Sequence, residues 1–198
     1  MTNAEKPVIT HWNYLLSLED DLARLSRYIE LREDNYATYS LELARVLFAA
    51  ASEVDVVARQ LCEKLDSGSK ADNIASFRIA IIEAYPQISA SIVFLPQFGL
   101  TMTPWEDWAW DASPFWWRAY NNVKHHRHTH FSEASLQNTL NAVAGLFVLL
   151  LFFYRDEATT GKLAPGARLL SAGHPFREDR LFWDEHTKIY LLDSDPRI

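Results

Sequence analysis

A run of apolar residues from 142 to 154 constrains the fold of this chain more than any other sequence feature. The run is interrupted only by Gly145, and its 13 residues fall well short of the roughly 20 that a helix needs to span a bilayer. Three residues with polar amide side chains come shortly before it on the same helical stretch. Because a helix that is apolar on all sides must be enclosed by other elements, we predict a buried core helix that begins at Ser132 and ends near residue 154, and no membrane span.

Composition and charge place the chain among soluble globular proteins. It has 198 residues, of which 48 % are apolar and 23 % charged, as expected for one folded domain. The single cysteine, Cys62, cannot form an internal disulfide, and the N-terminus lacks the basic-then-apolar layout of a signal peptide, so we predict a cytoplasmic protein. A formal charge of −7 argues against binding of nucleic acid or acidic membranes by the whole surface.

Apolar residues recur at helical spacing through most of the chain. Gly and Pro then break the last forty residues into a tail with an expected β-hairpin. The helices are predicted at residues 12–29, at 36–65, at 73–85 with Asp72 as N-cap, at 105–110 with a capping box from Thr103 to Glu106, and at 115–126; short extended segments are predicted at 92–95 and 100–102, and hairpin strands at 180–183 and 188–192 around a turn at 184–187.

The pattern therefore predicts an all-α fold, a bundle of about four or five main helices with short irregular or β segments. Residues 1–158 are assigned to the helical domain. Residues 159–198 are assigned to a hairpin-like tail that packs on the helical body, because a segment this short and broken cannot form its own core.

The residues with chemical potential are concentrated between 116 and 131, in the sequence WWRAYNNVKHHRHTHF. There is no carboxylate from residue 112 to residue 132, whereas Arg118, Lys124 and Arg127 supply three fixed positive charges. Four of the seven histidines also lie here, namely His125, His126, His128 and His130. In an acidic chain, this segment is a local reversal of sign that suits contact with phosphate groups.

On a helix, Trp116, Ala119 with Tyr120, and Val123 would form an apolar stripe, while Arg118, Asn121 with Asn122, and His125 would form a polar stripe about 10 Å long. Histidine exchanges protons near neutral pH, and arginine binds phosphate oxygens through its forked guanidinium. This stripe is predicted to bind or cleave a phosphodiester. The alternative is that it is an ordinary solvated helix face.

Two further expectations concern metal and association. The spacing HHxHxH matches no specific ligand geometry, so we predict no stoichiometric metal and no cofactor. The tryptophans between 105 and 117 are interpreted as core or interface residues, with base stacking as the alternative. The exposed aromatic density that we expect around residues 105–117 exceeds what a monomer usually leaves uncovered, so we predict a two-fold homodimer with the helix of residues 116–127 at or near the interface.

The segment WRAYNNVKHHR (residues 117–127), followed by a Ser-capped apolar helix, resembles the HEPN family (higher eukaryotes and prokaryotes nucleotide-binding domains). The resemblance covers residues 12–154, and its hallmark is an Arg followed after a short spacer by a His, here Arg118 and His125. It implies an all-α domain that acts as a dimer. It also implies a metal-independent ribonuclease of a toxin, defence or RNA-processing system, with a cognate antitoxin as a candidate partner.

By this resemblance His125 would transfer protons, Arg118 or Arg127 would hold the phosphate, and Asn121 would orient the phosphate or the imidazole. Lys124, Arg127 and Asn122 would make further RNA contacts, and the product would be a 2′,3′-cyclic phosphate. In the tighter form of the motif, however, the Arg position is occupied by Tyr120. The alternative interpretation is therefore a non-catalytic, dimeric helical interaction protein that retains the same stripe.

Overall fold

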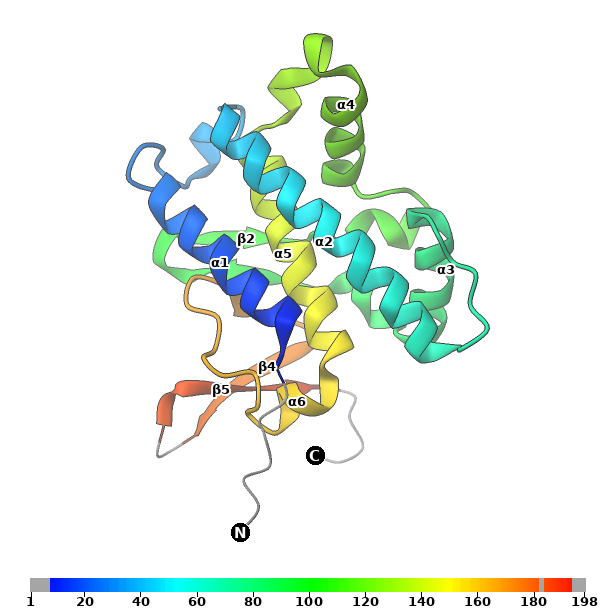
Figure 1. Ribbon diagram of the computed structural model, residues 1–198. Coiled ribbons are helices and arrows are strands. Elements are labelled where there is room, and N and C mark those ends of the chain that lie inside the picture. Colours follow the sequence, from blue (N-terminus) through cyan, green and yellow to red (C-terminus); the bar gives the residue numbers. More distant parts are fainter. Residues whose placement is uncertain (1–7, 182–183, 194–198) are drawn as a thin grey trace.

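Helices make up most of the chain in the computed structural model, which describes residues 8–181 and 184–193 (Figure 1). Within those residues there are six α-helices and five short strands, joined in part by 3₁₀ turns. The helices are α1 (Thr10–Leu25), α2 (Leu41–Leu65), α3 (Ile74–Ala84), α4 (Phe115–His130), α5 (Leu136–Phe153) and α6 (Arg155–Thr159), and the strands are β1 (Val93–Leu95), β2 (Leu100–Met102), β3 (Ser171–Ala172), β4 (Phe176–Leu181) and β5 (Asp184–Leu192).

Helix α5 lies at the centre and packs against α1, α2 and α4 (Figure 1). Among the described residues it is the one helix long and apolar enough to cross a membrane by length and composition, but 83 % of it is buried inside the fold. The prediction of a buried core helix is thus confirmed. Its predicted start was wrong: Ser135 caps the helix by accepting a hydrogen bond from the Asn138 N–H at 3.3 Å, and Ser132 lies in the preceding 3₁₀ turn η5 (Phe131–Glu133).

Two other helix starts differ from the sequence prediction because another side chain makes the cap. Helix α3 is capped by Asn73, whose Oδ1 accepts the N–H groups of Ala75 and Ser76 at 3.0 and 3.1 Å, rather than by Asp72. Helix α2 begins after Ser40, which accepts the Leu43 N–H at 3.1 Å, so the predicted helix start at residue 36 was wrong and residues 36–40 are not helical. In both cases several neighbouring residues are chemically able to cap, and the sequence pattern does not distinguish them.

The remaining predicted elements are found with shifted ends. The two extended segments are β1 and β2, which pair antiparallel, and the segment at 105–110 forms the 3₁₀ helix η4 (Glu106–Trp110). The predicted capping box was wrong: η4 begins after Trp105 without a side-chain cap, and Thr103 Oγ1 donates to the Glu106 carboxylate at 2.6 Å instead of accepting its backbone N–H. Helix α1 ends at Leu25 rather than at residue 29. The other 3₁₀ helices are η1 (Glu33–Asn35), η2 (Pro86–Ala90) and η3 (Pro96–Phe98).

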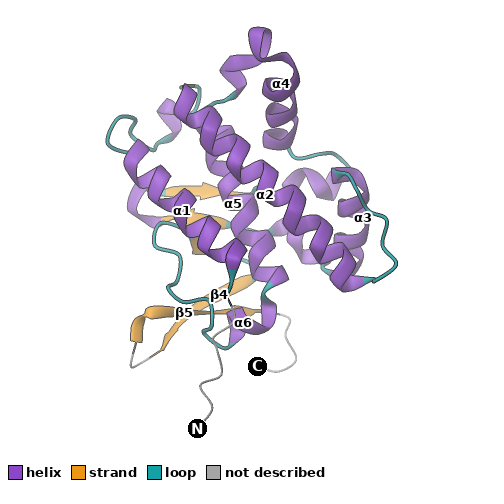
Figure 2. Cartoon of the chain, viewed as in Figure 1, coloured by secondary structure: helices purple, strands orange, loops and turns teal. Residues whose placement is uncertain are grey.

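The last part of the chain forms β-structure against the helical body (Figure 2). Strand β3 pairs antiparallel with β1, and β4 pairs antiparallel with β5. The predicted turn at 184–187 was wrong, because β5 begins at Asp184 and pairs it with Leu181; residues 182–183 lie outside the described residues. Tyr190 of β5 is fully buried between Trp12 and Phe147, at ring-centroid distances of 5.9 and 5.8 Å.

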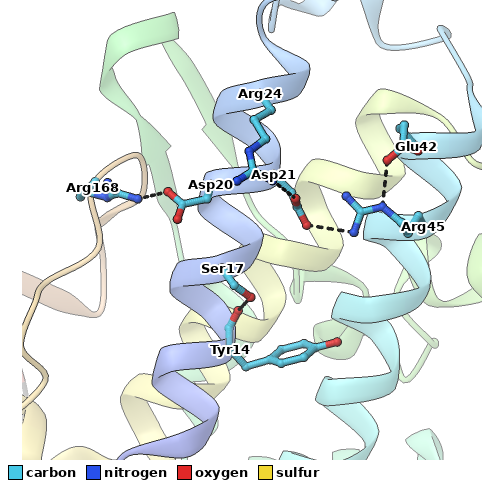
Figure 3. A network of polar contacts seen from close by, with 8 residues as sticks. All are labelled: Tyr14, Ser17, Asp20, Asp21, Arg24, Glu42, Arg45 and Arg168. Carbon is cyan, nitrogen blue, oxygen red and sulfur yellow. Dashed lines mark hydrogen bonds and ion pairs between the residues drawn. The ribbon is translucent and has the colours of Figure 1, made fainter.

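The segment before β3 is held to α1 by one buried carboxylate. Glu19 accepts the backbone N–H groups of Arg168, Leu169 and Leu170 at 2.9, 3.0 and 2.8 Å. Burial raises the pKa of Glu19, and the three amide donors oppose that rise. The side chain of Arg168 also contacts Asp20 on the same helix (Figure 3).

Charged side chains also connect α1 to the start of α2. Asp21 of α1 accepts from Arg45 at 3.1 Å, and Arg45 in turn donates to Glu42 at 2.8 Å (Figure 3). These hydrogen bonds raise the pKa of Arg45. Since half of the Arg45 side chain is exposed, solvent screens the pairs and they add little to stability; they fix the orientation of the side chains more than they hold the helices together.

The tryptophans before α4 belong to the core, which removes the sequence-based reason for expecting an uncovered aromatic surface. Trp105, Trp108 and Trp116 are at most 1 % exposed, and Trp117 is 7 % exposed. Trp110 is the exception in this group, with 83 % of its surface exposed. The aromatic rings fill the space between η4, α4 and α5, where apolar burial is the largest favourable term.

This aromatic cluster depends on Gly145 of α5. The Trp105 indole donates to the Gly145 carbonyl at 3.1 Å, and the Trp116 indole donates to the Pro104 carbonyl at 2.7 Å. A Cβ atom at position 145 would lie only 2.9 Å from the Trp116 ring. The missing side chain therefore lets both indoles approach the backbone of the core helix.

We expect Gly145→Ala to destabilise the protein. Overpacking costs about 1–3 kcal/mol, and the better helix propensity of alanine offsets up to about 1 kcal/mol of it. The melting temperature should fall by about 2–4 °C per kcal/mol of net loss. The control is Gly68→Ala, where the added Cβ meets only the Asp66 carboxylate at 3.4 Å; equal melting temperatures for the two variants would contradict the argument.

Candidate basic segment of helix α4

Helix α4 divides into a buried first part and an exposed last part. The predicted apolar stripe is confirmed: Trp116, Ala119, Tyr120 and Val123 are all buried. After Val123, the residues from 124 to 129 are all exposed. The end of the helix thus projects beyond the other helices, at the top of Figure 1.

The helix continues to His130, four residues past its predicted end, but it is kinked at His126, which has the non-helical dihedral angles φ −135° and ψ 40°. The kink lies in the exposed stretch that follows the last buried residue, Val123, where packing no longer aligns the chain with the helix axis. Beyond it, Thr129 donates to the His126 carbonyl at 3.1 Å. The kink turns the histidine-rich end away from a straight continuation of the polar stripe.

Glu133 forms hydrogen bonds with residues at both ends of this projecting segment. Its two carboxylate oxygens accept from the Asn122 amide at 2.9 Å and from the His130 ring at 2.6 Å. Its own backbone carbonyl accepts from Asn138 of α5 at 2.8 Å. Through its carboxylate and its backbone carbonyl, Glu133 therefore connects the residues on both sides of the exposed segment 124–128 to the core helix.

The three predicted catalytic residues of the polar stripe, Arg118, Asn121 and His125, have different surroundings. Arg118 lies at the base, within 3.5 Å of Asp107, and also donates to the Ser113 carbonyl. Asn121 donates to the Trp117 carbonyl at 3.1 Å and faces a groove. His125 is exposed in the projecting segment, where its ring centroid lies 6.4 Å from that of His126.

The groove beside Asn121 has a volume of about 440 Å³ and lies between α2, the start of α3 and α4. Lys124 also lines it, with its ammonium 5.3 Å from the Tyr120 ring centre. On the opposite wall, Asp55 and Asp72 contribute carboxylates. Two carboxylates disfavour a phosphate in the groove itself, so Lys124 is the groove residue best placed to contact an anion on the outer side.

Arg127 is the cation of the projecting segment with the least competition from acidic groups. Its guanidinium lies 4.9 Å from the Phe131 ring centre, a cation–π contact that leaves its donors available. Among the described residues, no carboxylate lies within ion-pair distance of Arg127 or Lys124. Arg118, in contrast, already has Asp107 as its partner.

A second basic hollow, of about 390 Å³, lies where α1 ends and α2 begins. Three arginines line it: Arg24 and Arg45 are within ion-pair distance of Asp21, and Arg45 also binds Glu42, whereas Arg27 is exposed. Two of its three cations are therefore compensated by carboxylates, whereas Lys124 and Arg127 of the exposed segment 124–128 have no ion pair among the described residues.

Sequence reasoning missed the acidic partners of the candidate residues. Asp107 is 11 residues before Arg118, and Glu133 is 11 residues after Asn122, so no helical spacing connects them. The His130–Glu133 pair could have been predicted from the sequence, because its residues are spaced i and i+3. Across the described ranges, no group of three or more His, Cys, Asp or Glu side chains could hold a metal ion.

In comparisons with protein-family models, curated proteins and solved structures, the chain has no match. The likeness to HEPN domains therefore rests on the Arg–Asn–His pattern of α4. The mostly helical architecture of the described residues is compatible with an all-α bundle.

We expect Glu133→Ala to loosen the projecting segment without unfolding the protein. Amide hydrogen exchange should become faster at residues 124–131, because the hydrogen bonds to Asn122 and His130 are lost. The cost in global stability should stay near 1 kcal/mol, since the carboxylate is one-third exposed. Glu106→Ala, which removes another i,i+3 contact of an exposed Glu, serves as the control; unchanged exchange in Glu133→Ala would show that the carboxylate does not hold the segment.

Proposed function

We propose that this protein binds RNA through the exposed segment 124–128 of α4. The observation that carries the proposal is the uncompensated charge of this segment, in which Lys124 and Arg127 have no carboxylate partner among the described residues. Three exposed histidines between and beside them add ring N–H donors. Phosphate oxygens are the ligands that such an array recognises.

The remainder of the chain supports a local rather than a general interaction. With a formal charge of −7, most of the surface repels a polyanion. A projecting basic segment can contact the phosphates while the acidic body stays outside the range of strong repulsion, which is about 8–10 Å at physiological salt. Arg118 contributes less to binding in this arrangement, because Asp107 already neutralises it.

We further propose that bound RNA is cleaved without a metal ion. The favouring observation is a pair of exposed imidazoles, His125 and His126, with ring centroids 6.4 Å apart and cations on either side. In this reaction the 2′-hydroxyl attacks the adjacent phosphorus, the P–O2′ bond forms and the P–O5′ bond breaks. One imidazole takes the 2′ proton and another gives a proton to the leaving 5′ oxygen, which leaves a 2′,3′-cyclic phosphate.

The two-fold dimer is proposed from the HEPN resemblance alone, because the tryptophans that favoured it on sequence grounds are buried. In such a dimer two copies of the segment 124–128 would line one RNA path. Light scattering at micromolar concentration measures the mass, and a single-chain value would contradict the dimer.

We expect wild-type protein to bind a fluorescein-labelled single-stranded RNA in EDTA, with affinity that falls steeply as salt rises. Lys124→Ala and Arg127→Ala should each weaken binding and reduce the slope of log K against log salt by about 0.7. The matched controls are Lys162→Ala and Arg24→Ala, which remove exposed cations elsewhere. Equal effects of all four variants, or no salt-dependent binding, would contradict the proposal and favour the non-catalytic interaction protein.

Cleavage is tested with the same RNA by following product length and end group. We expect His125→Ala to lower the cleavage rate by about 10²–10⁴-fold, with an unchanged melting temperature, because one proton-transfer group is lost. His174→Ala removes a half-exposed histidine of the tail and should have no effect. Wild-type protein that binds RNA but leaves it intact would reject cleavage and retain the binding proposal.

A further inference from the structure

We infer that Tyr39 forms a stacking site for an unpaired nucleobase beside the segment 124–128. The inference rests on the proposed function, since it concerns which part of an RNA lies next to the contacted phosphates. It extends the site from α4 to a residue on a different part of the chain, which the sequence pattern did not single out.

The backbone of Tyr39 is fixed by the two core helices. Tyr39 forms an isolated antiparallel bridge with Ser135, the N-cap residue of α5, and the Leu136 N–H donates to the Thr38 carbonyl at 2.8 Å. The next residue, Ser40, caps α2. An aromatic ring on such a support loses little conformational freedom when a ligand stacks on it.

The side chain of Tyr39 reaches the basic segment through Phe131. The two rings are nearly perpendicular, at 84°, with centroids 5.8 Å apart, and Arg127 lies 4.9 Å from the centre of Phe131. A perpendicular contact leaves at least one face of the Tyr39 ring uncovered by Phe131. With 52 % of its surface exposed, Tyr39 offers that face to solvent.

The positive charge of Arg127 next to this ring favours a nucleobase, which is attached to a phosphate, over an apolar peptide. A strand whose phosphate contacts Arg127 carries its bases within a nucleotide or two of that contact, so one of them can reach the Tyr39 ring. Every base has a π-face, so such stacking tolerates different sequences. A duplex keeps its bases stacked on one another and cannot use the ring, which makes the site selective for unpaired RNA.

The test compares a single-stranded RNA that carries one 2-aminopurine with an RNA hairpin of the same number of phosphates. The stem of this hairpin is closed by a non-nucleotide linker, so that it has no unpaired bases. We expect Tyr39→Ala to weaken single-strand binding by about 5- to 100-fold and hairpin binding much less, with the salt slope unchanged because no phosphate contact is lost. The fluorescence of 2-aminopurine should be quenched by wild-type protein and by Tyr39→Phe, but not by Tyr39→Ala.

Two variants separate a stacking role from a structural one. Tyr39→Leu keeps an apolar side chain against Phe131 and should lose selectivity for the single strand as Tyr39→Ala does, which makes the test independent of a folding defect in the alanine variant. Tyr28→Ala removes a tyrosine that is 86 % exposed and should change nothing.

The outcomes distinguish the stacking site from the proposed function. If Lys124→Ala and Arg127→Ala weaken binding while Tyr39→Ala does not, or if Tyr39→Ala weakens single strand and hairpin equally, the stacking site is wrong and RNA binding stands. If wild-type protein binds neither RNA, the proposed function itself fails. Selective loss of single-strand binding and of quenching in both Tyr39→Ala and Tyr39→Leu supports the inference.

Discussion

The close approach of two indoles to Gly145 determines how the rest of the molecule is arranged around α5. A helix this apolar needs cover on every side, and Trp105 and Trp116 provide it on the side of η4 and α4. Because Trp116 is in the first turn of α4, the contact also fixes where α4 starts and the direction in which it leaves the core. The position of the basic segment is thus a consequence of core packing two turns earlier in the same helix.

Helix α4 combines a buried first part and an exposed last part within sixteen residues. Its first part is aligned by apolar burial, and its last part has no such support. Without Glu133, the exposed part would be a frayed helix end, which carries a conformational entropy cost for any ligand that orders it. The carboxylate reduces that cost by fixing the segment at both sides, at Asn122 and at His130.

Features that follow from a local sequence pattern were predicted, whereas contacts between residues far apart in the sequence were not. The existence of the main helices, the burial of α5 and the apolar face of α4 follow from periodicity, which every turn of a helix repeats. Caps were less certain, as with Asn73 instead of Asp72, because several adjacent residues were able to accept the same N–H groups. The partner of Arg118 and the approach of Tyr39 to Phe131 arise from tertiary packing, and no local pattern encodes them.

The way Glu19 holds the chain before β3 has a consequence for sequence variation. All three of its hydrogen bonds go to main-chain amides, at residues 168–170, so they are indifferent to the side chains at those positions. Any residue except proline supplies the same donor. Substitutions at these three positions therefore keep the hydrogen bonds to Glu19, although Leu170 is also a buried core residue and is constrained by packing. A change at position 19 would release the attachment, and an inserted or deleted residue in the segment would shift the amides out of register with the carboxylate.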